Sequence, residues 1–310
     1  MPEICEVTLT SQYLQTKLLG RYITGVRVVE GRYTHEQLKG IDLICRHRPL
    51  RVLKIDSKGK FMWFELEGPL EQGVYILNNF GMTGEWSFKS GDHDRVVFDV
   101  ETEPDNVERN KHYKLYYSDS RNFGLLEITT RRDTLENRVA KLAPDLLKTN
   151  FTDDDFVRWV RDYLAKSSRR RSVPIVRALL RQDKKDGIAS GIGNYLSSEV
   201  LYRAGISPHT AVGDLTEERV RRLAQAIRYI VKQCYIDNIT GYMVKLETFL
   251  PKHREKVKAG VLPEYHPDVQ VTETFHFRVY GREEDDEGNA VVAERIEPTR
   301  TTYWVPAVQS

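Results

Sequence analysis

The chain has 310 residues, of which 40% are hydrophobic and 30% charged, and its formal net charge is +2 at pH 7. This composition is ordinary for a globular protein, and the length suits two domains better than one. The three cysteines form no pair at metal-ligand spacing, which excludes a zinc ribbon and argues against a disulfide framework. No stretch reaches about 18 uninterrupted apolar residues and the start is not that of a signal peptide, so we expect a soluble intracellular protein.

The first half of the chain combines one helix with many short strands. Residues 3–19 place apolar side chains near a common face, which predicts an amphipathic helix. Beyond it, short runs of β-branched and aromatic residues recur between turn residues, and this spacing favours a β-sandwich or barrel with the helix packed on it. The predicted strands are 22–29, 60–66, 74–77, 95–100, 113–117 and 125–129.

The second half is mainly helical and ends in strands. Thr152 followed by three aspartates predicts a helix N-cap, and residues 216–235 carry an apolar stripe typical of a long helix. From Phe275 the pattern returns to two or three strands, which predicts a small hairpin module. We therefore expect an α+β protein of two domains, divided into residues 1–148, 149–270 (the helical domain with its following loop) and 271–310 (the hairpin).

One segment is strongly basic. Residues 163–185 contain eight basic residues and one acidic residue. Such a run is either a solvated face or a contact surface for a polyphosphate partner.

A glycine-rich turn follows the basic segment. Gly191 and Gly193 stand directly before Asn194, with helix-forming residues on both sides. Glycine lets a backbone approach a ligand closely, and the N–H groups at a helix start suit a phosphate oxygen. An ordinary turn between two helices would show the same pattern, so both interpretations stay open.

The same turn begins the longest of a series of motifs, GIGNYLSSEVLYRAGISP at residues 191–208. The others are MPEICEV (1–7), SKGKF (57–61), GMTG (81–84), DSRNFG (119–124), LAPDLL (142–147), FRVYGR (277–282) and TRTTYW (299–304). In this order they resemble the formamidopyrimidine-DNA glycosylase and endonuclease VIII family, and the longest motif resembles its helix–two-turn–helix signature. The resemblance spans residues 2–304 and implies a β-sandwich domain, a helix–two-turn–helix domain and a β-hairpin finger.

The resemblance implies a bifunctional DNA glycosylase/AP lyase of base excision repair, with Met1 removed and Pro2 as the N-terminus. A terminal amine has a pKa of about 8, so part of it is unprotonated and nucleophilic near neutral pH. It can attack C1′ of a damaged nucleotide and form a Schiff base, after which β,δ-elimination cuts the strand. Glu3 is then placed to move protons at the sugar, and Glu6, one turn on, to support the site.

Two residues beside the expected nucleophile depart from the family pattern. Ile4 and Cys5 stand where the family commonly has Leu or Gly followed by Pro. This departure supports the alternative hypothesis, a non-catalytic binder of damaged or abasic DNA. Cleavage of a duplex with an abasic site separates the two hypotheses.

The resemblance assigns further residues to DNA. Lys60, Asn194 and Arg300 match residues that contact phosphates near the lesion, and Gly191 and Gly193 belong to the same DNA-binding turn. Chemistry on a base requires that it leave the stack, and apolar wedges can open a base step. The residues that match the family's void-filling trio are Met82, Arg121 and Phe123.

The hairpin carries none of the four zinc-binding cysteines that the family often has there. Val305 and Val308 occupy the last two of these positions, which resembles the zincless finger of some endonuclease VIII-like members and favours oxidised pyrimidines and hydantoins as lesions. We predict no metal and no cofactor, and elemental analysis that finds one zinc per chain would contradict this. The expected partner is duplex DNA with oxidised bases or abasic sites, or damaged single strands, bound by a monomer.

Overall fold

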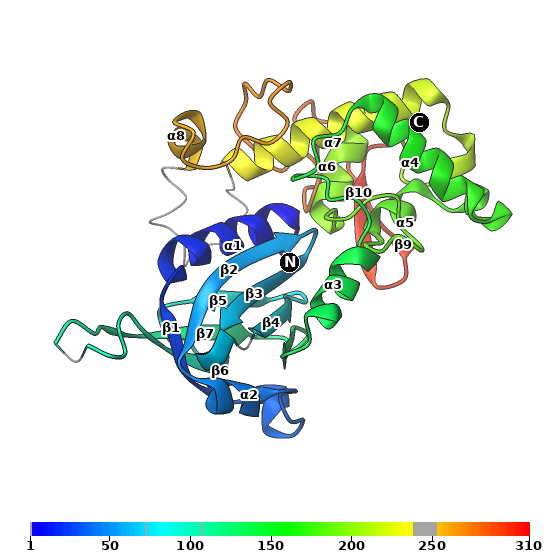
Figure 1. Ribbon diagram of the computed structural model, residues 1–310. Helices are drawn as coiled ribbons and strands as arrows, with labels where there is room; N and C mark the ends of the chain where they lie inside the picture. The colour runs from blue at the N-terminus through cyan, green and yellow to red at the C-terminus, as the bar shows by residue number, and fades with distance from the viewer. Residues whose placement is uncertain (1, 72, 107, 238–252) are drawn as a thin grey trace. The chain divides into compact units, whose positions relative to one another are not determined.

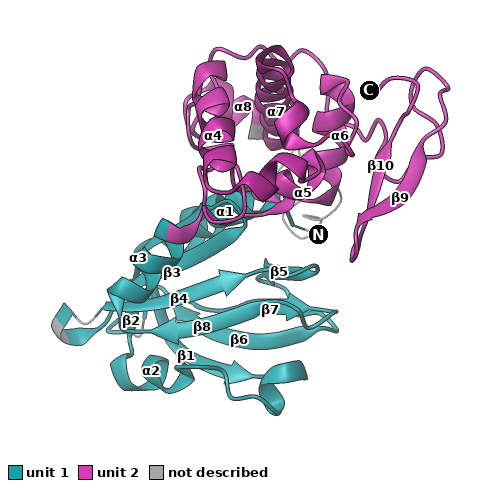
Figure 2. Cartoon of the chain, turned by 90° about the vertical axis from the view of Figure 1, so that its right-hand side faces the viewer, with its two compact units in different colours: residues 1–2, 6–140, 242–249 teal, residues 3–5, 141–241, 250–310 magenta. Residues whose placement is uncertain are grey.

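The computed structural model describes residues 2–71, 73–106, 108–237 and 253–310 (Figure 1). The chain divides into two compact units (Figure 2). The first unit contains Pro2 and Glu6–Ala140, and the second contains Glu3–Cys5 and most of the chain from Lys141 on. The α+β class with a sheet domain and a helical domain is thus confirmed, whereas the exact domain boundaries stay predictions. The segment 240–247, noted in the sequence as a turn after the long helix, lies outside the described residues.

Most helices and strands of the structure lie close to the positions that the sequence predicts. The N-terminal part contains α1 (Ile4–Leu18), β1 (Tyr22–Val28), α2 (Ile41–His47), β2 (Leu50–Lys58), β3 (Phe61–Glu67), β4 (Gly73–Asn79), β5 (Gly84–Ser87), β6 (Asp94–Glu101), β7 (His112–Asp119), β8 (Leu125–Thr129) and α3 (Arg132–Lys141). The second unit contains α4 (Asp153–Ala165), α5 (Ile175–Leu180), α6 (Asn194–Ala204), α7 (Glu217–Asp237), α8 (His253–Lys258), β9 (Val292–Glu297) and β10 (Arg300–Trp304). Among the described residues, no helix is long and apolar enough to cross a membrane.

The first unit is a β-sandwich made from one antiparallel sheet. Its strand order is β5-β7-β6-β1-β2-β3-β4-β8, and β1 pairs with β2 over only two residue pairs. The sheet therefore bends between two four-stranded halves whose apolar faces meet. Trp86 of β5 lies 5.1 Å from the ring of Phe64 on β3, and its indole N–H donates to Asn78 of β4 at 3.0 Å. This contact between the halves buries a large aromatic side chain with its polar atom satisfied.

The first helix packs on this sheet, as predicted. On α1, Gln15 accepts a hydrogen bond at 2.5 Å from the backbone N–H of Ile55 on β2. Among the described helices and strands of the N-terminal part, β2, β5, α2 and α3 were not predicted. Strand β2 has no continuous apolar run and breaks the alternation at exposed Leu53 and Lys54, so its sequence lacks a clear strand signal.

In the second unit, the predicted cap and long helix are confirmed. The Thr152 hydroxyl accepts from the N–H of Asp155 at 3.2 Å, and the Asp155 carboxylate accepts from the N–H of Thr152 at 2.9 Å. These two bonds form a capping box at the start of α4. Helix α7 buries the predicted apolar stripe, which includes Val220, Leu223 and Ile227.

The strand predicted from Phe275 to Gly281 is wrong. The backbone N–H groups of Arg278, Val279 and Tyr280 donate to the carboxylate of Glu199 on α6, at 3.0, 3.1 and 2.9 Å. These donors are therefore not available for a strand ladder. The hairpin module consists of β9 and β10, which pair with each other.

Candidate active site and nucleic-acid interface

The Glu3 carboxylate lies at the start of α6. It accepts hydrogen bonds from the backbone N–H groups of Gly193, of Tyr195 at 3.0 Å and of Leu196 at 3.4 Å, and the residue is fully buried. The first N–H groups of a helix have no partner within the helix, and the helix dipole favours negative charge there. This position therefore holds a charged carboxylate in one orientation.

The glycine turn before α6 is shaped around Ile4. Gly191 has φ of +122°, and a Cβ there would lie 2.3 Å from Cδ1 of Ile4. The N–H of Ile4 donates to the Gly191 carbonyl at 3.1 Å, and the N–H of Gly191 donates to Gln182 at 2.7 Å. Because the N–H of Gly193 donates to Glu3, the N–H groups of Gly191 and Gly193 are used within the protein. We therefore assign these two glycines to the shape of the turn rather than to a phosphate contact.

The two unusual residues at the start of α1 are both buried. Ile4 and Cys5 have no exposed surface, and the Cys5 thiol lies 3.5 Å from the carbonyl oxygen of Val231 on α7. The sequence departure thus fills apolar space in the second unit.

A cluster of polar side chains joins α6 to the hairpin. Asn194 donates through Nδ2 to the carbonyl of Thr301 at 2.7 Å, and its side chain lies near enough to the Tyr280 hydroxyl to act on the pKa of that group. Burial raises the pKa of the Tyr280 hydroxyl, so this group is a protonated donor near neutral pH. Nη1 of Arg300 and Oδ1 of Asn194 are buried without a hydrogen-bond partner. Buried polar atoms are normally paired, so this guanidinium nitrogen is a donor suited to a bound ligand.

Tyr280 was not predicted as a site residue. The motif FRVYGR that contains it was recognised, but nothing in the sequence separates this tyrosine from its neighbours. Its proximity to Asn194 depends on the Glu199 carboxylate, which binds the N–H of Tyr280 from another element.

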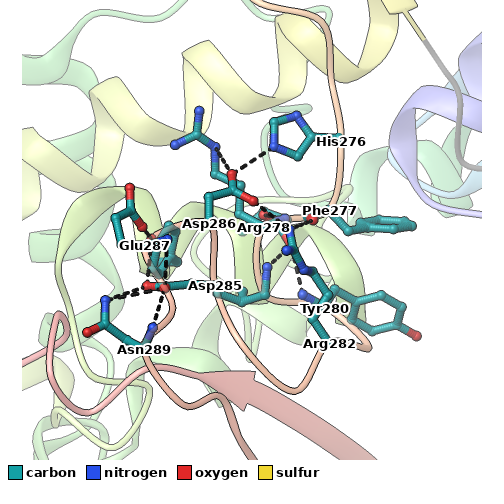
Figure 3. A network of polar contacts seen from close by, with 12 residues as sticks. His276, Phe277, Arg278, Tyr280, Arg282, Asp285, Asp286, Glu287 and Asn289 are labelled. Carbon is teal, nitrogen blue, oxygen red and sulfur yellow. Dashed lines mark hydrogen bonds and ion pairs between the residues drawn. The ribbon is translucent and has the colours of Figure 1, made fainter.

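A hydrogen-bonded turn precedes the hairpin (Figure 3). His276 and Arg282 bind the two carboxylate oxygens of Asp286 at 2.9 and 2.6 Å. Asp285 accepts from the N–H of Asn289 at 2.7 Å and from its side-chain amide. These bonds define the path of the chain between residues 276 and 289 without a metal ligand set.

The hairpin packs through apolar contacts. Val305 is fully buried against Tyr202 and Val279, whereas Val308 is 42% exposed. Within the described ranges, no group of three or more His, Cys, Asp or Glu side chains could hold a metal ion. The absence of zinc stays a prediction for elemental analysis.

The three void-filling candidates lie on two neighbouring loops of the first unit. Met82 follows β4, and Arg121 and Phe123 follow β7. Nη1 of Arg121 lies 3.2 Å from the Met82 sulfur. Met82 is 37% and Phe123 60% exposed, so both side chains are accessible to a partner.

Three further predicted residues also belong to the first unit. Pro2 lies two residues before the start of α1, and Glu6 is buried in the first turn of this helix. Lys60 lies in the two-residue turn between β2 and β3, where Gly59 adopts φ of +55°. The neighbouring Lys58 donates to the carbonyl of Val139 on α3 at 3.1 Å.

Part of the basic segment serves the protein's own fold. Lys166 donates to the carbonyl of Lys184, and Arg170 donates to the carbonyl of Tyr163 at 3.2 Å while its guanidinium lies 4.8 Å from that ring. These contacts favour a structural role for Lys166 and Arg170 over a polyphosphate contact.

Three family models match the chain. They are the formamidopyrimidine-DNA glycosylase N-terminal domain at residues 1–126, its H2TH domain at 142–242 and its C-terminal domain at 267–310. The chain belongs to the formamidopyrimidine-DNA glycosylase family. The predicted family and enzyme class, a DNA glycosylase with AP lyase activity, are thereby confirmed.

Individual relatives agree with this assignment. The formamidopyrimidine-DNA glycosylase of Thermus thermophilus is 30% identical over 235 residues, which covers 75% of each protein. The crystal structure of the MutM (Fpg) protein from Thermus thermophilus matches with a TM-score of 0.70 at 25% identity, over 99% of this chain and 98% of that one. The fold is also that of Lactococcus lactis Fpg in complex with DNA containing an abasic site, with a TM-score of 0.71, 18% identity and 99% of both chains covered.

Proposed function

We propose that this glycosylase removes oxidised bases, with oxidised pyrimidines and hydantoins favoured, through a Schiff base on Pro2. After Met1 is removed, the Pro2 nitrogen bonds to C1′ while the base leaves with the glycosidic electron pair and takes a proton. The nitrogen then loses its proton and the C1′–O4′ bond breaks, with O4′ taking up a proton, so that the sugar opens and an iminium forms. The iminium acidifies the 2′ proton, and its loss expels the 3′ phosphate. Loss of the 4′ proton then expels the 5′ phosphate, which completes β,δ-elimination.

The observation that best supports this proposal is the buried, oriented carboxylate of Glu3. It is the side chain that directly follows the proposed nucleophile, and three backbone N–H groups fix it. A general acid or base must be held within reach of the proton that it moves. A protein that only binds DNA has no need for such a carboxylate beside a terminal amine.

Donors of the second unit are suited to hold the DNA backbone. Arg300 offers a buried guanidinium nitrogen without a partner. Asn194, which donates to the adjacent Thr301, and Tyr280 add an amide and a hydroxyl. Lys60 supplies a further cation from the β2–β3 turn. A guanidinium suits two phosphate oxygens at once, and the Lactococcus lactis relative was solved with abasic DNA, which supports the same class of partner here.

Cleavage and trapping at an abasic site test this function. The mature chain is incubated with an abasic duplex, with and without borohydride. We expect nicked strands, and with borohydride a covalent protein–DNA adduct. Binding without a nick or adduct would favour the alternative of a non-catalytic binder, and a panel of duplexes that each carry one oxidised base tests the lesion preference.

A substitution tests the phosphate contact separately. Arg300→Ala is expected to weaken binding to the abasic duplex and to lower the slope of log affinity against log salt by about one, because one phosphate loses its cation. Arg131→Ala is the matched control, since this exposed arginine pairs with Asp133 on the surface. An unchanged slope for Arg300→Ala, measured by fluorescence anisotropy from low to moderate salt, would remove Arg300 from the interface.

A further inference from the structure

The two loops that carry the void-filling candidates are joined to each other. The first is residues 80–84, between β4 and β5, and the second is residues 119–124, between β7 and β8. Strands β5 and β7 are neighbours in the sheet, with Gly84 opposite Asp119 at the end of their ladder. The two loops therefore leave the sheet side by side.

A buried carboxylate and a hydroxyl connect these loops. The Thr83 hydroxyl donates to Oδ1 of Asp119 and accepts from the N–H of Arg121 at 3.0 Å. Oδ2 of Asp119 accepts from the N–H of Gly124 at 2.6 Å. Asp119 is 1% exposed, so its charge depends on these donors. One carboxylate thus holds both ends of the 119–124 loop and, through Thr83, the 80–84 loop.

The backbones of the two loops also meet without space for a side chain. Gly81 has φ of +64°, and a Cβ there would lie 2.7 Å from the nitrogen of Gly124 and 2.7 Å from the carbonyl carbon of Phe123. A Cβ on Gly124 would lie 1.8 Å from the Tyr117 hydroxyl oxygen. This close packing restricts sliding of one loop past the other.

An arginine anchors the arrangement to the sheet. Nε of Arg95 on β6 donates to the Asp119 carbonyl at 2.8 Å, and Arg95 pairs with Glu30. Arg95 is 7% exposed. The joint between the loops is therefore fixed to the sandwich.

We propose that Asp119 and Thr83 are positioning residues that hold Met82, Arg121 and Phe123 as one rigid wedge for the space left by an extruded base. This inference rests on the proposed function. A wedge of three side chains on two loops must be ordered when it enters DNA, and ordering costs conformational entropy. The hydrogen bond between Thr83 and Asp119 provides this order before DNA binds. Loss of this bond therefore slows extrusion of a base from a paired duplex, whereas the rates of steps that need no extrusion stay unchanged.

The test is Thr83→Val, which removes the hydroxyl and keeps the shape, with Thr83→Ser as the conservative rescue. Single-turnover excision of an oxidised pyrimidine is measured in a fully paired duplex and in a bubble where the lesion is unpaired, because an unpaired base costs less to extrude. We expect Thr83→Val to slow the duplex reaction roughly tenfold, as for one lost hydrogen bond to a charged group. The bubble reaction should stay within about twofold, and Thr83→Ser should restore the duplex rate.

The matched control is Thr24→Val, which removes a 2.8 Å hydroxyl bond to Glu101 at the opposite end of β6 from the loops; its duplex-to-bubble ratio should equal that of the parent. Asp119→Asn, which should show the same selective loss, is the second variant if Thr83→Val fails to fold. Equal slowing on both substrates, or no rescue by serine, would overturn the positioning role.

Arg121→Ala separates a failure of the positioning role from a failure of the void-filling function. If Arg121→Ala shows no selective loss on the paired duplex, the void-filling function itself fails. If Arg121→Ala shows the loss and both Thr83→Val and Asp119→Asn do not, only the joint is refuted.

Discussion

Blocking the amine of Pro2 is expected to abolish covalent capture of DNA. A variant with one uncleaved residue ahead of Pro2 turns the ring nitrogen into an amide, whose lone pair is delocalised and no longer nucleophilic. Strand cleavage at an abasic site should fall by at least about a thousandfold, as for removal of other catalytic nucleophiles. The borohydride adduct should disappear while binding to the duplex persists.

The N-terminus of each preparation must be verified by mass spectrometry, since a mixture of processed and unprocessed chains would blur the result. Pro2→Gly is a useful companion but is not decisive, because a terminal glycine still offers a primary amine. An adduct that forms at the parental rate with the blocked chain would exclude Pro2 as the nucleophile and would direct attention to an internal lysine.

Replacement of Glu3 by glutamine is the second change with a large expected effect. Glu3→Gln removes the charge that the start of α6 stabilises and places an amide N–H₂ where both oxygens now accept hydrogen bonds. Excision of an oxidised base should fall by roughly a hundredfold or more, the usual contribution of a positioned proton donor or acceptor. Cleavage at a preformed abasic site should fall much less, because no base has to leave.

The same substitution should lower the free energy of unfolding by roughly 1–3 kcal/mol, since buried backbone donors lose a charged acceptor. Glu36→Gln is the control, because this exposed carboxylate pairs only with Arg32 on the surface. Chemical denaturation measures stability, and single-turnover kinetics on paired substrates measures the two reactions. Equal losses on damaged and abasic DNA would assign Glu3 to structure alone.

Most of the fold could be predicted because its signals are local. The cap at the start of α4 is formed by Thr152 and Asp155, which are three residues apart, and the apolar stripe of α7 repeats every three or four residues. Both features are present in the structure. The strand predicted after Phe275 failed because Glu199, about 80 residues earlier, takes its backbone donors. No periodicity within the segment could indicate that competition.

The candidate site was also predictable where its signals are local and not where it depends on contacts between distant residues. Motif order indicated Met82, Arg121 and Phe123, but the Thr83–Asp119 bond depends on the pairing of β5 with β7. Likewise, the glycine turn before α6 was predicted to approach a phosphate, with an ordinary turn between two helices as the alternative. The structure fills it with Glu3, which is 190 residues away in the sequence from Gly193.

The construction of the hairpin has a consequence for the conditions under which the enzyme works. Residues 271–310 contain neither cysteine nor methionine, and the element that presents Arg300 is secured by valine packing and by hydrogen bonds to α6. The peroxides and radicals that oxidise DNA bases therefore meet no sulfur in this module. If the hairpin binds DNA through Arg300 as proposed, this contact should survive the oxidative stress that damages DNA.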